Sequence, residues 1–330
     1  MKPSILLFTL LATASLIGRV FSEETRKFTS ADGTKTFDGV FSSFDVASGI
    51  VEVKRAGHSV MKFPLTMLSA ADQTYIKEHS DGDKPVTDFV PKASKGGKNR
   101  MEVRSVTKDL EKRLETVNPK YLAAFPPDFT KAKSGTIPLV IYLHGSAGRG
   151  DDPMSCIDMP FNQIVGSQKE FPAMVISPQL RNVMLEGQTK PRMSWHLEDL
   201  DRLLKDILKE FPQIDQDRVY LTGFSMGGYG TWDWTAASRK HFAAIVPISG
   251  GANTAAPRTP KNFGDLPIWA FHGDADTTVL PQSSIKLYES IKAAGGDVQL
   301  TLLPGVTHDC SEQVYLNPEV FRWLFSKKRP

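Results

Sequence analysis

The sequence predicts an α/β protein, built as a doubly wound and mostly parallel sheet that follows a small β module. From about residue 101, apolar strand-like runs alternate with helical stretches. These runs are apolar throughout, which is typical of parallel strands covered by helices on both faces. Residues 24–80 instead hold short β-branched and aromatic segments between glycine-bearing turns, and they predict the β module.

Composition narrows the class of protein and its partners. The chain has 330 residues, 40% of them apolar and 23% charged, which is ordinary for a soluble globular protein. Its net charge of +3 gives no electrostatic reason to expect nucleic acid or a membrane surface as a partner. The sequence has no histidine pair at i, i+4 and no cysteine cluster of the kind that binds a metal. We therefore expect no metal and no cofactor.

The first 22 residues resemble a secretory signal. Lys2 precedes an apolar run over residues 5–17, and "VFS" ends at Ser22 with residues that a signal peptidase accepts. The run is too short to span a membrane, so we expect cleavage and export to the periplasm or the extracellular space. The alternative is an uncleaved start that anchors the chain. In an oxidising compartment Cys156 and Cys310 could form a disulfide, and the alternative is two buried thiols.

Residues 24–80 predict a small β unit closed by one helix. The segments "TFDGVFSSF", "GIVEVKRAG" and "SVMKFPL" read as strands, and Ser69 with Asp72 forms a capping-box pattern before a short helix. The stretches "TSADGTKTFDGVF" and "PLTMLSAADQTYI" resemble the Sla-type homology module, an SH3-like domain that binds short peptides in an endocytic adaptor. That resemblance implies a peptide or protein partner for this module. Residues 81–100 are polar and rich in glycine, proline and lysine, and we expect a linker.

The strands and helices of the second domain, residues 101–330, follow from their apolar patterns. The expected strands are residues 137–145, 171–178, 218–224, 242–250, 267–273 and 297–305. The expected helices are residues 195–211, 226–239, 282–294 and 318–326. Residues 251–266 are too short for a helical lid, although residues 150–170 and 178–194 are also rich in loops.

Ser225 is the candidate nucleophile. It lies in "GFSMG", after the predicted strand "RVYLTGF" and before a predicted helix, which is the setting that the G-x-S-x-G elbow requires. The backbone N–H of Met226 would then face an oxyanion at the start of that helix. In this order of elements the acid and then the histidine follow the serine. His308 in "GVTHDC" is the only histidine after the last predicted strand, while Asp274 and Asp276 both fit as the acid.

The second domain resembles the exported α/β-hydrolases of the carboxylesterase, dienelactone-hydrolase-like and predicted-peptidase group. The resemblance rests on "YLHGSAGRGDD", "RVYLTGFSMGGYGTW", "FHGDADTTVLP" and "PGVTHDC". It implies the α/β-hydrolase fold and a Ser–His–Asp triad. The H-G-x-x-D-x-x-V pattern implies Asp276 as the acid, and the loop after "YLHG" implies Ser146 as the second oxyanion donor.

These residues predict a serine hydrolase that forms an acyl-enzyme on a carboxylic ester. Small soluble esters or acylated carbohydrates are the expected substrates, and Trp195 is a candidate substrate contact. One alternative is a peptidase of the prolyl-oligopeptidase type, since the same triad serves amides. Another is a binding protein that acts through its N-terminal module.

Overall fold

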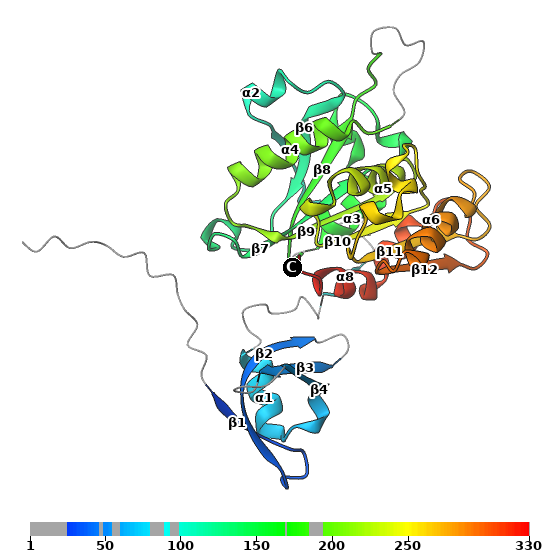
Figure 1. Cartoon of the computed structure of the whole chain (residues 1–330). Helices are drawn as coiled ribbons and strands as arrows, with labels where there is room; N and C mark the ends of the chain where they lie inside the picture. Colours follow the sequence, from blue (N-terminus) through cyan, green and yellow to red (C-terminus); the bar gives the residue numbers. More distant parts are fainter. Residues whose placement is uncertain are drawn as a thin grey trace, which may run out of the picture. The chain divides into compact units, whose positions relative to one another are not determined.

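The computed structural model divides the chain into two compact units, Met1–Asp83 and Lys84–Pro330 (Figure 1). It describes residues 25–45, 49–54, 60–79, 89–92, 99–168, 170–184 and 194–329. The expected signal segment lies outside these residues, as does most of the expected linker. Among the described residues no helix is long and apolar enough to cross a membrane.

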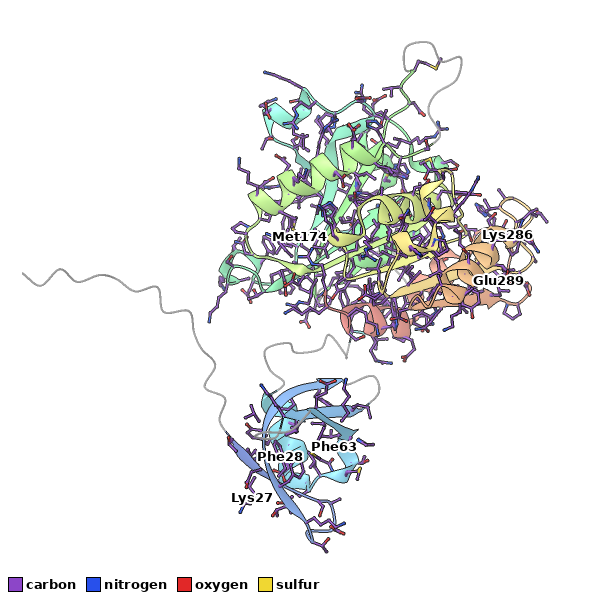
Figure 2. The ribbon with its side chains drawn as sticks, viewed as in Figure 1. Lys27, Phe28, Phe63, Met174, Lys286 and Glu289 are labelled. Carbon is purple, nitrogen blue, oxygen red and sulfur yellow. The ribbon has the colours of Figure 1, made fainter. Side chains whose placement is uncertain are left out.

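In the part that the structure describes, the N-terminal unit is a four-stranded antiparallel sheet with one α-helix. Its elements are β1 (Arg26–Thr29), β2 (Thr36–Asp45), β3 (Ile50–Lys54), β4 (Val60–Pro64) and α1 (Ala70–His79), and the strands pair in the order β1-β2-β3-β4. Its buried core is formed by Phe28, Val51, Val53, Leu65, Leu68 and Ile76. Phe63, labelled with Phe28 in Figure 2, packs against this core from β4.

Half of the expected capping box forms at the start of α1, because the Ser69 backbone N–H donates to Thr29 O and not to Asp72. Ser69 Oγ accepts a hydrogen bond from the Asp72 backbone N–H at 3.2 Å and donates to Asp72 Oδ2 at 2.8 Å. Asp72 also accepts from Arg26 and from the backbone N–H of Thr29, so the helix is fastened to β1. Burial would raise the pKa of Asp72, but these hydrogen bonds outweigh it and hold the pKa below its usual value. The likeness of this unit to SH3-like domains stays a prediction.

The second unit is an eight-stranded sheet flanked by helices. Its strands are β5 (Glu102–Ser105), β6 (Val117–Ala124), β7 (Ile137–Leu143), β8 (Met174–Leu180), β9 (Ile214–Phe224), β10 (Ala244–Ile248), β11 (Ile268–Gly273) and β12 (Val298–Leu303). Its α-helices are α2 (Lys108–Glu111), α3 (Pro160–Ser167), α4 (Leu197–Glu210), α5 (Met226–Ser238), α6 (Gln282–Ala293), α7 (Ser311–Leu316) and α8 (Pro318–Phe325). The strand order is β12-β11-β10-β9-β7-β8-β6-β5. Strands β7 to β12 are parallel to one another, and β5 and β6 add antiparallel strands at one edge.

Two hydrophobic cores lie on the two faces of this sheet. Along β7, Leu139 and Ile141 contribute to one core, while Val140 and Tyr142 contribute to the other. Helices α4, α5 and α6 cover the first face, and α3, α7 and α8 cover the second. On α6 the exposed side chains include Lys286 and Glu289 (Figure 2). Central strands that are buried on both faces have continuous apolar sequences, as the predicted strands do. The predicted doubly wound fold is therefore confirmed.

The structure adds elements that the sequence pattern does not indicate. Strand β6 contains Asn118-Pro119, which reads as a turn, and a register shift in its pairing with β8 accommodates that dipeptide. Strand β5 is mostly exposed at the edge of the sheet, so it carries no apolar run. Residues 150–170 read as rich in loops, but helix α3 within them buries Phe161, Ile164 and Val165 in the core, so this helix is part of the fold and not a lid.

Part of the expected linker packs on the second unit. The Phe89 ring lies 5.0 Å from the Phe171 ring and 5.3 Å from the Phe321 ring, centroid to centroid, in edge-on contacts. The side chain of Asn99 accepts a hydrogen bond from the backbone N–H of Met101 and donates to the carbonyl of Asn162. The chain is therefore held to the second unit before β5 begins.

Candidate active site

Ser225 occupies a sharp turn between β9 and α5. Its φ of 55° and ψ of −116° lie in a region that residues with a side chain rarely adopt. Two backbone hydrogen bonds hold the turn: the Ser225 N–H donates to Ile248 O on β10, and the Tyr229 N–H donates to Ser225 O, both at 2.9 Å. The neighbouring strand and the first turn of the helix thus impose this strained geometry.

The glycines of the motif are required by close backbone contacts. A side-chain carbon on Gly223 would collide with the backbone of Gly227, and one on Gly227 would collide with the carbonyl group of Leu143. A side chain on Gly228 would meet the carbonyl of Ile248. The helix can therefore start directly above the ends of β7 and β10 only because these positions lack a side chain.

The structure brings Ser225, His308 and Asp276 into one hydrogen-bonded chain. His308, in the loop between β12 and α7, has its Nε2 2.9 Å from Ser225 Oγ and its Nδ1 2.7 Å from Asp276 Oδ2. An ionised carboxylate only accepts, so Nδ1 carries the proton and the free Nε2 faces the serine hydroxyl. This is the arrangement in which a histidine removes a proton from serine.

Asp276 is held from its other side as well. Its Oδ1 accepts from the backbone N–H groups of Thr278 and Val279 at 2.8 and 2.9 Å, and the residue is 2% exposed. Burial would raise the pKa of Asp276, but the hydrogen bonds from His308, Val279 and Thr278 outweigh it, so the pKa lies below its usual value. Asp276 is therefore ionised at neutral pH.

The other candidate acid lies elsewhere. Asp274 is exposed, and its Oδ1 accepts from the backbone N–H of Gly305 at 2.7 Å. That bond joins the loop after β11 to the loop after β12. Of the two aspartates, the structure places only Asp276 in contact with His308.

The loop after β7 lies beside the nucleophile. Ser146 begins a 3-10 turn over Ser146–Gly148, and Gly145 precedes it. A side-chain carbon on Gly145 would be 3.6 Å from Ser225 Cβ, so the backbone passes close to the serine. Met226 is the first residue of α5, where the N–H groups have no partner within the helix. The two N–H groups that the sequence suggested as oxyanion donors therefore belong to segments that flank Ser225.

His144 supports this loop from behind. The ring is fully buried, its Nε2 accepts from the backbone N–H of Leu180 at 3.0 Å, and its Nδ1 lies 2.6 Å from Gly145 O. The Leu180 contact places the proton on Nδ1, which donates to Gly145. Burial lowers the pKa of His144 to about 4, so the imidazole is neutral at pH 7.

Trp195 packs behind the same loop. Its ring lies 4.9 Å from the His144 ring, and it covers Gly230 of α5, where a side-chain carbon would be 2.5 Å from the indole. Trp195 is 3% exposed and lines a cavity of about 210 Å³ with Asp233 and Thr254. It precedes α4, which begins at Leu197 rather than at residue 195.

Ser249 also contacts the site without having been singled out in the sequence. It follows β10, is fully buried, and has a φ of 46°. Its Oγ donates to His308 O at 3.2 Å, and the Cys310 N–H donates to the same carbonyl at 3.0 Å. These contacts anchor the loop that carries His308. A serine after a strand has no sequence signal that would mark this role.

The two cysteines are separate, buried thiols rather than a disulfide. Cys156 Sγ donates to Gly148 O at 3.1 Å, and Cys310 Sγ lies 3.2 Å from Ser249 Oγ. Burial raises the pKa of both thiols, that of Cys156 to about 11. Within the described ranges, no group of three or more His, Cys, Asp or Glu side chains is placed to hold a metal ion.

Comparisons with known proteins agree with this architecture. Residues 175–313 match the dienelactone hydrolase family. A thermostable esterase of known structure aligns over 70% of this chain and 63% of its own length, with 27% identity and a TM-score of 0.53. A candidate dipeptidyl aminopeptidase IV from Bacteroides ovatus aligns over 92% of this chain and 43% of its own, with 15% identity and a TM-score of 0.51. No curated protein matches the chain significantly.

The chain spans less than two thirds of the length of both structures, and the second, at 15% identity, shows the fold alone. The family match covers β8 to α7, which includes the strand–turn–helix that carries Ser225. The sheet order and the match to the thermostable esterase place the second unit in the α/β-hydrolase fold, and part of it is similar to the dienelactone hydrolase family.

Proposed function

We propose that this protein is a serine hydrolase that cleaves carboxylic esters through an acyl-enzyme. The observation that carries the proposal is the continuous contact from Ser225 Oγ through His308 to Asp276 Oδ2, with both distances below 3 Å. Ser225, the last member of this hydrogen-bonded series, lies in a strained turn that presents its hydroxyl beside two backbone segments with N–H groups.

In the proposed reaction, Ser225 Oγ attacks the ester carbonyl while its proton passes to His308 Nε2. The Met226 and Ser146 amides stabilise the oxyanion, and His308 then gives the proton to the leaving alcohol. A water molecule, deprotonated by the same nitrogen, attacks the acyl-enzyme and releases the acid and Ser225. Asp276 holds the imidazole in the required tautomer and stabilises its charged form.

The surroundings of the site favour small or soluble esters, including acylated carbohydrates. Over residues 251–266 the described chain forms only two single-turn 3-10 helices, Ala256–Arg258 and Pro260–Asn262, so this segment builds no helical lid. Such a segment leaves room for bulky polar substrates. We also propose that the protein is exported and that its N-terminal unit binds a peptide or protein partner. Trp195 would contact substrate only through the cavity that it lines.

The test is hydrolysis of para-nitrophenyl acetate and butyrate by the wild type and by Ser225→Ala, beside a proline-containing peptide anilide. We expect ester turnover that is lost in Ser225→Ala and little release of the anilide. Anilide cleavage at a comparable rate would favour a peptidase. A folded wild type that cleaves neither substrate would overturn the proposal and leave the N-terminal unit as the part to examine.

A further inference from the structure

A second imidazole faces the oxygen of Asp276 that contacts His308. His272 lies near the end of β11, is fully buried, and has its Nε2 3.2 Å from Asp276 Oδ2. The same oxygen lies 2.7 Å from His308 Nδ1. One carboxylate oxygen therefore lies between two histidines, and the proposed mechanism uses only one of them.

The surroundings of His272 fix its tautomer. Its Nε2 faces two acceptors, Asp276 Oδ2 and the Val279 carbonyl oxygen at 2.8 Å. The proton of the neutral ring must then be on Nε2, because an unprotonated nitrogen would be repelled by both oxygens. Nδ1 lies 2.8 Å from Ser284 Oγ on α6, which donates to Gly250 O at 3.0 Å, so with the ring proton on Nε2 the single hydroxyl hydrogen is shared between Nδ1 and Gly250 O. Burial lowers the pKa of His272 and outweighs the Val279 carbonyl and Asp276, so the ring is neutral at pH 7.

We propose that His272 is a positioning residue for the Ser225–His308–Asp276 chain. Its Nε2–H holds the Asp276 carboxylate and the Val279 carbonyl together, and so keeps Oδ2 directed at His308. This inference rests on the proposed function, since it concerns the same site. His272 acts on the base through Asp276, because it shares the charged oxygen that orients His308.

Sharing the oxygen has a consequence for the base. Asp276 Oδ2 holds the His308 ring through Nδ1 at 2.7 Å, so a movement of the carboxylate also moves the base. Nε2 of that ring must stay close to Ser225 Oγ, 2.9 Å away, to accept its proton. Loss of the His272 donor should therefore lower kcat more than it raises KM.

Two substitutions separate the two ring nitrogens. His272→Gln has an amide N–H that reaches about as far as Nε2, whereas His272→Asn reaches only as far as Nδ1. We expect His272→Gln to stay within a few-fold of the wild type. His272→Asn should lose roughly 10- to 100-fold in kcat/KM, mostly in kcat, which is the usual effect of losing one hydrogen bond to a charged group.

His241→Gln is the matched control. His241 is also next to an aspartate, with its Nε2 3.4 Å from Asp201 Oδ1, but it lies outside the site. We expect this variant to keep the kcat and the KM of the wild type. Equal values of kcat and of KM in His272→Asn and His272→Gln would overturn the proposal.

A measurement on the wild type covers the case in which a variant fails to fold. In a nitrogen-15 histidine spectrum, we expect His272 as the neutral Nε2–H tautomer at pH 7 and at pH 8. The Nδ1–H tautomer, or a charged ring, would refute the proposal. This readout does not require ester hydrolysis, so a wild type without activity would overturn the proposed function while the spectrum still tests His272.

Discussion

Gly227 lies directly against the carbonyl group of Leu143, with no room for a side-chain carbon between them. This contact joins the first turn of α5 to the end of β7, and it sets the distance between Ser225 and the loop that contains Ser146. The nucleophile and the proposed oxyanion donors are thus positioned by one contact between backbones.

We predict that Gly227→Ala lowers both stability and activity. The added methyl group must push the helix away from Leu143, and overpacking of this kind typically costs about 1–3 kcal/mol. Urea denaturation would measure the loss, and para-nitrophenyl acetate hydrolysis should fall more than the folded fraction explains. Unchanged stability and turnover would show that the helix can shift without consequence.

Ser225 itself should carry a stability cost. Its φ of 55° is unfavourable for any residue with a side chain, and such conformations cost about 1–3 kcal/mol. Ser225→Gly removes the strain, although glycine gains entropy in the unfolded chain, so we expect a net gain of about 1 kcal/mol in the free energy of unfolding. Ser225→Ala keeps the strain and is the control. A glycine variant less stable than the alanine variant would contradict the prediction.

Asp276 and Asp274 offer a matched pair of substitutions. Asp276→Asn removes the charge that orients His308, and the comparable change in a serine protease triad lowers kcat by about 10⁴-fold. Asp274→Asn affects only an exposed bond to Gly305, so we expect turnover within a few-fold of the wild type. The measurement is kcat for para-nitrophenyl butyrate in both variants. Equal losses would mean that the two loops act as one unit and that Asp276 has no separate role.

The same two aspartates show which parts of the fold and of the site can be predicted from the sequence. The fold class, the buried parallel strands and the strand–turn–helix at Ser225 follow from local patterns, because apolar runs and a G-x-S-x-G motif report on nearby structure. Spacing could not separate Asp274 from Asp276, and the resemblance to a known family was needed. Nor could the sequence indicate how His272 and Ser249 contact Asp276 and His308, because these contacts arise only when β10, β11 and the loop of His308 meet. Strand β6 was missed because Asn118-Pro119 resembles a turn.

His144 predicts a dependence of stability on pH. Its pKa is about 4 in the folded protein and about 6.5 in an unfolded chain, so between these values the unfolded state binds more protons. Stability is therefore greatest above about pH 6.5 and falls as the pH drops toward 4. Between pH 7.5 and pH 5 the loss attributable to this ring is about 2 kcal/mol.

His144→Gln removes the titrating group, while its side-chain amide oxygen, which reaches about as far as Nε2, can still accept from the Leu180 backbone N–H. Urea denaturation of wild type and variant at pH 7.5 and pH 5 isolates the effect, because other titrating groups contribute to both proteins. We expect the difference between the two pH values to be about 2 kcal/mol smaller in the variant. The same difference in both proteins would mean that His144 does not titrate in this range. That result would contradict the interpretation, based on its burial and its two backbone contacts, that His144 is a neutral ring shielded from water that supports Gly145.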